Sequence, residues 1–270
     1  MNFRSKIKAL YQRIISGMSA NNNPLFIFFY KYFYRPPEGT IEEFTDIFSR
    51  YRRKIKVVQV GANDGITNDP IHKFIKRDGW EGVLLEPQKY VFEKFLQPLY
   101  RKTQGIITVN AALDRTDGYK PVYKISASNS RWATGLTSFN REVLEKALSS
   151  GYIEKQAKKE GLKIEDSAAS LITEEKVECI SPETLITRYN LDRIDWLQID
   201  TEGYDYEIIK MFNIEKTKPC VIVYKNLHLP EEQKKECREM LEKNGYRCRD
   251  FGPNSLAVLD PPECLQKFFA

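Results

Sequence analysis

Residues 57–65 read Val-Val-Gln-Val-Gly-Ala-Asn-Asp-Gly and predict a strand that runs directly into a tight turn. Val57, Val58 and Val60 are β-branched, which favours the extended backbone of a strand. The apolar run reaches back to Ile55, as in a strand buried on both faces of a parallel sheet. We therefore expect this strand to lie at the centre of an α/β fold.

The turn carries glycine where the backbone needs freedom. Gly61 and Gly65 bracket it, and a glycine can take a positive φ or lie directly against a ligand. Asn63, between them, is of a residue type tolerated in the left-handed region. A helix should follow, because residues 68–69 offer an N-cap and Pro70 suits a first helical position. Strand, turn and helix form the first unit of a doubly wound nucleotide-binding domain.

The turn differs from the dinucleotide fingerprint, which would place glycine where this chain has Asn63 and Ile66. The sequence also lacks the phosphate loop that ends in Gly-Lys-Ser/Thr. Both observations disfavour an NAD-dependent enzyme and leave a turn suited to an adenosyl ligand without a pyrophosphate. The alternative interpretation is an ordinary strand-to-helix connection.

A second buried strand is predicted at residues 82–86 (Gly-Val-Leu-Leu-Glu), and it ends in an acid. In nucleotide-binding units, a carboxylate at the tip of the second strand accepts hydrogen bonds from the ribose hydroxyls, about 20 residues after the glycine turn. Glu86 lies 21 residues beyond Gly65. We therefore expect Glu86 to bind a ribose, with a surface glutamate as the alternative.

Composition indicates a soluble globular protein. The 270 residues are 41% hydrophobic and 29% charged, which is enough apolar material for a full core. The five cysteines are scattered and odd in number, so we expect a reducing compartment, the cytoplasm, with neither a zinc site nor a disulfide framework. Residues 1–56 carry a net charge of +7 and the remainder −2. Because the basic charge avoids the expected catalytic domain, we expect no nucleic-acid partner.

Residues 1–53 form a basic, aromatic N-terminal extension that precedes the domain expected at residues 54–262. Apolar residues recur at helical spacing in residues 3–15, and basic residues lie around the rest of that helix. Residues 25–34 are almost wholly aromatic or aliphatic but too few to span a bilayer as a helix. One interpretation is peripheral membrane contact through residues 1–34. The other is packing on the domain or in a homodimer interface.

The middle of the chain breaks the strand-helix rhythm. Residues 106–113 predict a third strand, residues 119–125 a hairpin arm and residues 176–180 another short strand. Between them, residues 126–175 combine a Ser/Asn/Thr-rich loop with a charged helical stretch over residues 140–161. An insertion at this point is expected to be a substrate lid, with a solvated decoration as the alternative.

A second group of candidate site residues follows the strand predicted at residues 194–200. Asp200, Glu202 and Asp205 place three carboxylates within six residues at a strand's carboxyl end, where ligands bind in open parallel sheets. Crowded carboxylates can raise one another's pKa, so one can act as a base, or a pair can hold Mg²⁺. We expect Asp205 only to open the next helix, where its charge favours the helix dipole.

Strands alternate with helices along the chain, and a final pair of strands at residues 246–251 and 255–259 closes the pattern. This order suits the Rossmann-like, seven-stranded sheet of class I methyltransferases, which use S-adenosylmethionine, with helices on both faces. Three blocks carry a closer resemblance: residues 58–65, Leu85-Glu-Pro87 and Ile199-Asp-Thr-Glu-Gly203. Together they resemble the hallmark blocks of the FkbM family of S-adenosylmethionine-dependent methyltransferases, over about residues 55–260.

The resemblance implies transfer of a methyl group to an oxygen, commonly a hydroxyl of a sugar, glycolipid or other secondary metabolite. It implies that the glycine turn holds the methionine part of the cofactor, that Glu86 holds the ribose, and that Asp200 and Glu202 lie at the reaction centre. The cofactor-binding residues expected on this basis are Gln59, Gly61, Ala62, Asn63, Gly65, Glu86 and Asp200. No bound metal is expected.

Two positions depart from the family pattern. Gln59 stands where the first block usually has an acid, and Lys225 stands where a glutamate often follows the fifth strand. His228, near that strand end, is a further candidate base after Asp200 and Glu202. The departures, with the basic aromatic N-terminus, leave a second hypothesis open: a catalytically decayed Rossmann-like protein that acts as a membrane-associated binding or scaffold module.

Overall fold

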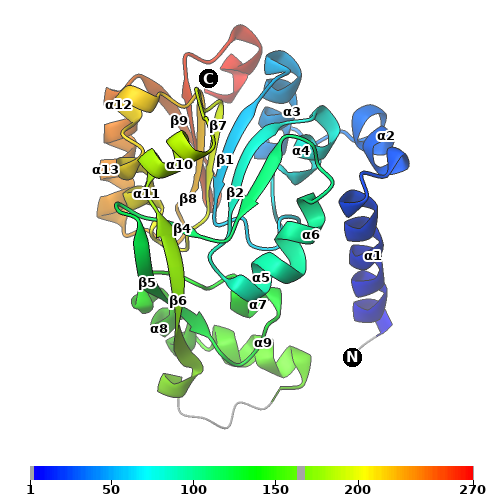
Figure 1. The fold of residues 1–270 in the computed structure, drawn as a ribbon, viewed down its shortest axis with the longest axis vertical. Helices are drawn as coiled ribbons and strands as arrows, with labels where there is room; N and C mark the ends of the chain where they lie inside the picture. Colours follow the sequence, from blue (N-terminus) through cyan, green and yellow to red (C-terminus); the bar gives the residue numbers. More distant parts are fainter. Residues whose placement is uncertain (1–2, 163–167, 270) are drawn as a thin grey trace.

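A seven-stranded sheet runs through the centre of the protein, in the order β3-β2-β1-β7-β8-β10-β9 (Figure 1). The computed structural model describes residues 3–162 and 168–269. The strands are β1 (Lys56–Val60), β2 (Glu81–Leu85), β3 (Ile106–Val109), β7 (Trp196–Ile199), β8 (Val221–Lys225), β9 (Tyr246–Phe251) and β10 (Asn254–Leu259). All neighbours pair in parallel except β10, which is antiparallel to β8 and β9. The expected Rossmann-like sheet of class I methyltransferases is confirmed.

Helices cover both faces of this sheet, as the near-continuous apolar strands require. Val58 and Val60 of β1 pack into the core on one face, while Val57 packs into the core on the other. The first face is covered by α10 (Pro182–Arg188), α11 (Asp205–Met211) and α13 (Glu231–Lys243). The second is covered by α3 (Ile41–Arg52), α4 (His72–Asp78) and α6 (Gln97–Tyr100).

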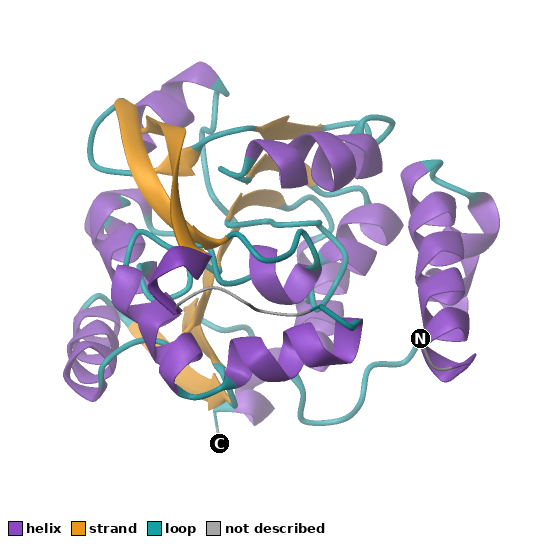
Figure 2. Ribbon diagram, turned by 90° about the horizontal axis from the view of Figure 1, so that it is seen from below, coloured by secondary structure: helices purple, strands orange, loops and turns teal. Residues whose placement is uncertain are grey.

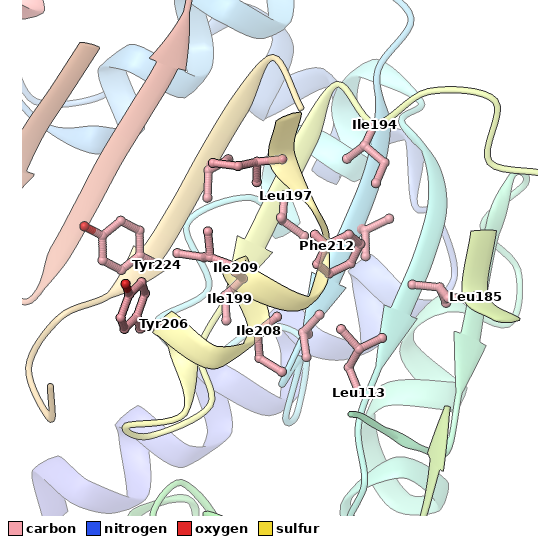
Figure 3. Packing of buried hydrophobic residues seen from close by; sticks show 14 of the residues in the cluster. Leu113, Leu185, Ile194, Leu197, Ile199, Tyr206, Ile208, Ile209, Phe212 and Tyr224 are labelled. Carbon is pink, nitrogen blue, oxygen red and sulfur yellow. The ribbon is translucent and has the colours of Figure 1, made fainter. Parts of the chain in front are cut away.

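Helix α11 fixes the chain that leaves β7. Ile208 and Ile209 of the helix and Phe212 just after it are fully buried and pack beside Leu197 and Ile199 of the strand (Figure 3). Each such side chain contributes about 1.5–3 kcal/mol when it leaves water. The five residues between β7 and α11 are therefore held at both ends by core packing.

The helices that follow β1 and β2 differ from regular α-helices, the first in where it starts and the second in its interior. Helix α4 begins at His72 rather than Pro70, because the Asp69 carboxylate caps the amides of Ile71 and His72 instead. The helical segment after β2 is built from α5 (Lys89–Val91), a π-helical turn η1 (Phe92–Leu96) and α6. Two short elements complete the domain, α12 (Ile214–Thr217) and the 3₁₀ turn η3 (Glu263–Phe268).

A second, three-stranded sheet of order β4-β6-β5 flanks the first. Its strands are β4 (Ala112–Leu113), β5 (Gly118–Ile125) and β6 (Ile172–Ile180). The prediction of one strand over residues 106–113 is wrong, because the Asn110 side chain donates to the carbonyls of Glu86 and Pro87 and separates β3 from β4. Strand β6 also begins before the predicted residue 176, since it pairs with β5 along its length.

The insertion folds between β5 and β6 as α7 (Arg131–Thr134), α8 (Arg141–Ser149), α9 (Tyr152–Glu160) and the 3₁₀ turn η2 (Ala168–Leu171). The charged stretch predicted at residues 140–161 is two helices, because Gly151 takes a left-handed conformation with φ of 70° between them. These helices form the lower end of the molecule in Figure 1. Seen from that end, helices and loops of the insertion lie in the foreground beside a long strand (Figure 2).

The N-terminal extension contributes α1 (Phe3–Ala20) and α2 (Pro24–Tyr32), which lie beside α6 and α4. Buried hydrogen bonds link the Ser19 hydroxyl to Nε2 of His72, and Nδ1 of His72 to the Tyr100 hydroxyl, each at 2.9 Å. Burial lowers the pKa of His72 to about 3, so this ring is neutral. Within the described residues, none of the helices has both the length and the hydrophobicity needed to cross a bilayer.

Candidate active site

The glycine turn after β1 wraps the end of β2 and touches the end of β7. The amides of Gly61 and Ala62 donate to the Leu85 carbonyl at 3.1 and 2.8 Å. Gly61 has φ of 80°, and a Cβ there would fall well inside contact distance of the Asp200 carbonyl oxygen. The glycine is therefore required by close approach of two backbones, which joins the ends of β1, β2 and β7 in one corner.

Of the other turn residues, Asn63 lines the candidate site, whereas Ala62 and Gly65 pack against the core. Asn63 has a left-handed φ of 48° and lines an enclosed cavity together with Gly61. Ala62 is buried in the core on the α4 face, and a Cβ on Gly65 would meet Leu96 and Tyr100. Ala62 and Gly65 thus shape the turn through packing, and a direct cofactor contact by either stays a prediction.

Glu86 lies at the carboxyl end of β2 and is only 2% exposed. One carboxylate oxygen accepts from the Asn63 amide at 2.8 Å, and the other accepts from the Gln88 amide and side chain at 2.9 and 3.2 Å. Burial raises its pKa to about 7, although these donors and Arg131 oppose the shift. The structure therefore holds the predicted ribose-binding carboxylate beside the glycine turn and lining the enclosed cavity.

Gln59 points away from the cavity that Gly61 and Asn63 line. Its side-chain nitrogen donates to Asp69 at 2.9 Å, and Asp69 in turn caps α4. Burial raises the pKa of Asp69 to about 6. Gln59 therefore supports the turn through Asp69, and its direct role in cofactor binding stays a prediction.

A compact charged cluster lies at the carboxyl ends of β7 and β8. The Lys225 ammonium lies 2.7 Å from a Glu202 oxygen and 3.1 Å from an Asp200 oxygen. The second Glu202 oxygen lies 2.8 Å from Nε2 of His228. The structure thus brings together all three predicted catalytic residues and adds Lys225 between the two carboxylates.

Burial and neighbouring charges shift the pKa values of Asp200, Glu202 and Lys225. Burial of its carboxyl group raises the pKa of Asp200, with Lys225 opposing and Glu202 adding to the shift. Burial also acts to raise the pKa of Glu202, but His228 and Lys225 outweigh it and the pKa is lowered. The two carboxylates outweigh the burial of Lys225 and raise its pKa. Glu202 and Lys225 therefore remain charged near neutral pH.

Two features hold Glu202 in place. Its backbone has φ of 50°, an uncommon conformation for a glutamate, and its carbonyl accepts from the Ser138 hydroxyl at 2.8 Å. Strain of this kind persists only where the surrounding structure enforces it and clusters at functional sites. The insertion, through Ser138, therefore helps to position a predicted catalytic residue.

Asp205 is a structural residue of this corner. It is fully buried, and its carboxylate accepts from the amides of Thr201, Gly203 and Lys225 at 3.1–3.3 Å. Burial raises its pKa to about 7. The residue opens α11, as expected, and ties the loop after β7 to the end of β8.

Two hollows meet at the charged cluster. An enclosed cavity of about 50 Å³ is lined by the glycine turn, Glu86 and residues 131–139 of the insertion. A larger cleft of about 1010 Å³ is lined by Lys225, His228 and residues of α8 and α9. Asp200 and Glu202 line both. A ligand in one hollow and a ligand in the other would therefore meet across these carboxylates.

The sequence did not single out the part of the insertion that covers the cavity. The Thr134 carbonyl of α7 accepts from the side chains of Asn63 and Gln88 at 3.2 and 2.9 Å. The Arg131 guanidinium is near enough to oppose the raised pKa of both Glu86 and Asp200, and Arg131 lines both hollows. The only sequence signal is its place in an insertion after a strand end, which does not separate Arg131 from the other 41 lysines and arginines.

The residues around the cavity fit the expected adenosyl cofactor. Glu86 offers a buried carboxylate beside the glycine turn, and the Nε of Arg131 and hydroxyl of Thr137 are buried without a hydrogen-bond partner among the described residues. Such unpaired polar atoms are uncommon in folded proteins and suit a polar ligand. Pockets for ligands of this size span roughly 300–1,000 Å³, so the cavity of about 50 Å³ would have to widen to admit one.

A metal site finds less support. Among the residues that the structure describes, no three or more His, Cys, Asp or Glu side chains are arranged to hold an ion. Between Asp200 and Glu202, where the sequence left Mg²⁺ open, the Lys225 ammonium supplies the positive charge.

Comparison with known proteins identifies the family. The model of the methyltransferase FkbM domain matches residues 59–248. The crystal structure of methyltransferase FkbM from Methylobacillus flagellatus KT superposes with a TM-score of 0.45 and 13% identity, over 76% of this chain and 44% of that chain. The delta-N METTL16 MTase domain superposes with a TM-score of 0.39 and 9% identity, over 88% and 95%.

The chain thus spans less than half the length of the Methylobacillus protein. A search of the curated proteins found no match. The family model covers most of the chain, including the glycine turn, Glu86 and the charged cluster. The protein therefore belongs to the FkbM family of methyltransferases.

Proposed function

We propose that this protein uses S-adenosylmethionine to methylate a hydroxyl oxygen of a sugar, glycolipid or other secondary metabolite. One observation supports this best: the cavity beside Glu86 and the cleft beside His228 share Asp200 and Glu202 as a common wall. Methyl transfer requires the donor and the acceptor oxygen to be aligned in one line. Adjoining hollows that meet at a charged cluster suit that requirement.

The cavity side would hold the cofactor, which supplies an activated methyl group as a sulfonium. Glu86 would accept hydrogen bonds from the ribose hydroxyls, replacing the contacts that Gln88 makes with it now. Asn63 and Gly61 would contact the cofactor through the turn backbone. Arg131, close to both Glu86 and Asp200, would close the cavity from the insertion.

The cleft side would bind the acceptor and remove its proton. We assign His228 as the base, because Glu202 holds the ring at 2.8 Å and a negatively charged partner favours the protonated product. Asp200, which is 35% exposed and lines both hollows, is the second candidate base. The acceptor oxygen would gain the methyl carbon, the carbon–sulfur electron pair would stay on sulfur, and the proton would pass to the base.

Calorimetric titration with S-adenosylmethionine and S-adenosylhomocysteine tests the cofactor. Glu86→Ala should weaken binding at least about 100-fold, since hydrogen bonds to a charged group contribute about 1.5–3 kcal/mol each. Glu81→Ala, at the exposed opposite end of β2, is the matched control and should bind normally. A screen of glycans and glycolipids for label from methyl-labelled cofactor then tests the acceptor. Equal affinity of both variants would refute the assignment.

A second candidate is a decayed methyltransferase that acts as a binding or scaffold module. Lys225 favours it, because its ammonium occupies the space between the two carboxylates of the proposed reaction centre. Intact, folded protein that binds neither S-adenosylmethionine nor S-adenosylhomocysteine would support this candidate. We place either activity in the cytoplasm, where the five cysteines would stay reduced, and thiol titration in denaturant should count five.

A further inference from the structure

The outer face of α2 is an apolar stripe. Its members recur at positions i, i+3, i+4, i+7 and i+8, so they share one face of the helix. They are 51–70% exposed, and we call them the α2 stripe: Leu25, Phe28, Phe29, Tyr32 and Phe33. With Leu10 and Ile14 of α1, they make up seven of the fifteen exposed large apolar side chains among the described residues. Apolar groups gathered in this way mark interaction surfaces.

The opposite face of α2 is docked on the domain. Phe26 is 3% exposed and packs edge-on against His72 of α4, with 6.2 Å between ring centroids. The Asn23 side chain caps the helix through the Leu25 amide at 2.9 Å. The α2 stripe is therefore held outward as a preformed surface, and Figures 1 and 2 show α1 and α2 as a pair at the side of the molecule.

The segment of the sequence that carries the α2 stripe has charges of one sign only. Residues 1–37 contain six lysines and arginines and no acid, while residues 38–270 carry a net charge of −1. Arg13, Lys31 and Arg35 are exposed. A second copy of this chain would bring two +6 segments together if it docked here with two-fold symmetry. An anionic surface would instead gain from every one of these charges.

We propose that the α2 stripe and the surrounding basic residues dock the protein on an anionic lipid bilayer. Phe28, Phe29 and their neighbours would enter the headgroup region, and Lys31 and Arg35 would meet lipid phosphates. Helices that lie in an interface combine such an apolar face with lysines and arginines.

Vesicle co-sedimentation of the full chain tests the contribution of the apolar α2 stripe to membrane binding. Phosphatidylcholine vesicles with phosphatidylglycerol should bind the wild-type protein, and vesicles of phosphatidylcholine alone should bind it at least tenfold more weakly. Phe28→Ser with Phe29→Ser should reduce binding to the anionic vesicles at least tenfold. The matched control is Tyr90→Ser with Phe95→Ser, which removes two aromatics exposed to 41% and 43% elsewhere and should leave binding unchanged. Thermal melts confirm that each variant folds.

Charge reversal tests the basic half. Lys31→Glu with Arg35→Glu should reduce binding to anionic vesicles at least tenfold, since each Lys or Arg near such a surface contributes about fivefold. Reversal of the exposed Lys216 and Lys235 on α12 and α13 should have little effect. Wild-type protein that binds neither vesicle would overturn the proposal. So would a solution dimer that Phe28→Ser with Phe29→Ser converts to a monomer while vesicle binding is unchanged.

Discussion

Glu86 and Glu202 are both buried glutamates at the carboxyl edge of the same sheet, yet their surroundings differ in kind. Glu86, at the end of β2, is held by uncharged donors, the Asn63 amide and the Gln88 amide and side chain. Glu202, after β7, is held by Lys225 and His228. The neutral donors only partly offset burial, which raises the pKa of Glu86 to about 7, whereas the charged partners of Glu202 outweigh burial and lower its pKa.

The difference suits the two glutamates to the two roles that we propose, cofactor binding for Glu86 and support of the base for Glu202. A carboxylate among neutral donors can exchange one hydrogen bond for another with a ribose hydroxyl, without moving a charge. A carboxylate paired with an imidazole and an ammonium can stabilise the protonated imidazole that proton removal creates. Gly61 joins the corner around Glu86 to the corner around Glu202. Its backbone lies against the Asp200 carbonyl, and its amide donates to the Leu85 carbonyl at the end of β2.

The largest effect is expected on stability, from disrupting the close approach of Gly61 to Asp200. Gly61→Ala combines a left-handed backbone with a Cβ driven into the Asp200 carbonyl, so we expect a loss of about 3–5 kcal/mol in unfolding free energy. Gly39→Ala is the control, since Gly39 has φ of 71° with open space around it, and it should lose about 1 kcal/mol. Urea denaturation compares them. Equal losses would mean that the two corners are not rigidly joined.

The second-largest effect is expected on catalysis, at the corner around Glu202. Glu202→Gln keeps the side chain's shape but removes the charge that orients and supports His228. With an acceptor identified by the screen, we expect kcat to fall about 100-fold or more, the scale of general-base catalysis. Affinity for S-adenosylhomocysteine should change by less than about threefold, because we assign cofactor binding to Glu86.

Glu175→Gln is the matched control for this variant, since Glu175 pairs with Lys124 at 2.5 Å in the small sheet, away from the cluster. Its kcat should equal that of the wild type. If Glu202→Gln lost cofactor affinity and kept kcat, the division of roles between the two corners would be reversed.

The pH dependence of stability tests the first corner. The pKa of Glu86 is raised in the folded protein from an ordinary 4.5 to about 7, so the folded state keeps a proton that the unfolded state releases. Stability therefore falls as pH rises between these values, by at most about 3 kcal/mol. Glu86→Gln removes this dependence, and urea denaturation at pH 5 and pH 8 should show a shallower loss in the variant.

Comparing the wild type with Glu86→Gln isolates the contribution of Glu86 to the pH dependence. Asp69 and Asp205 also have raised pKa values, but they titrate in both proteins. Parallel pH profiles would show that Glu86 ionises in the folded protein at its ordinary pKa. The Gln88 and Asn63 donors would then outweigh burial, and the two corners would differ less than we infer.

The parts of the site that the sequence predicted are local. Strand β1, the turn at Gly61 and Glu86 follow from a β-branched, near-continuous apolar run, from glycine spacing and from a distance of some 20 residues along the chain. The Asp200, Glu202 and His228 cluster follows because the carboxyl ends of parallel strands meet at one edge. Lys225 was read only as a departure from a family pattern, although its ammonium bridges two of these residues.

What the sequence could not predict depends on distant pairing. Strand β5 pairs with β6 from Gly118 opposite Cys179 to Ile125 opposite Ile172, and the insertion lies between the two strands. Loop closure over that length leaves no periodic signal in the sequence. Thus neither the position of Arg131 nor the Thr134 carbonyl over Asn63 was visible before the structure placed α7 on the cavity.

The smallest expected effect is a spectral change in α7 as the cavity fills. The Thr134 carbonyl bonds Asn63 and Gln88, and a cavity of about 50 Å³ cannot enlarge without disturbing those bonds. Trp132 lies on α7, whereas Trp80 and Trp196 are fully buried in the core behind the sheet. Saturation with S-adenosylhomocysteine should therefore shift tryptophan emission by a few nanometres, roughly the scale of a partial change in solvent exposure.

Trp132→Phe assigns the signal, because this variant should bind with the same heat but without the emission change. A shift that survives in the variant would come from the core tryptophans and would mean that binding deforms the sheet itself. Binding with no shift in the wild type would mean that α7 stays in place. Glu86 would then exchange its partners without help from the insertion, and the two corners would differ only in their charges.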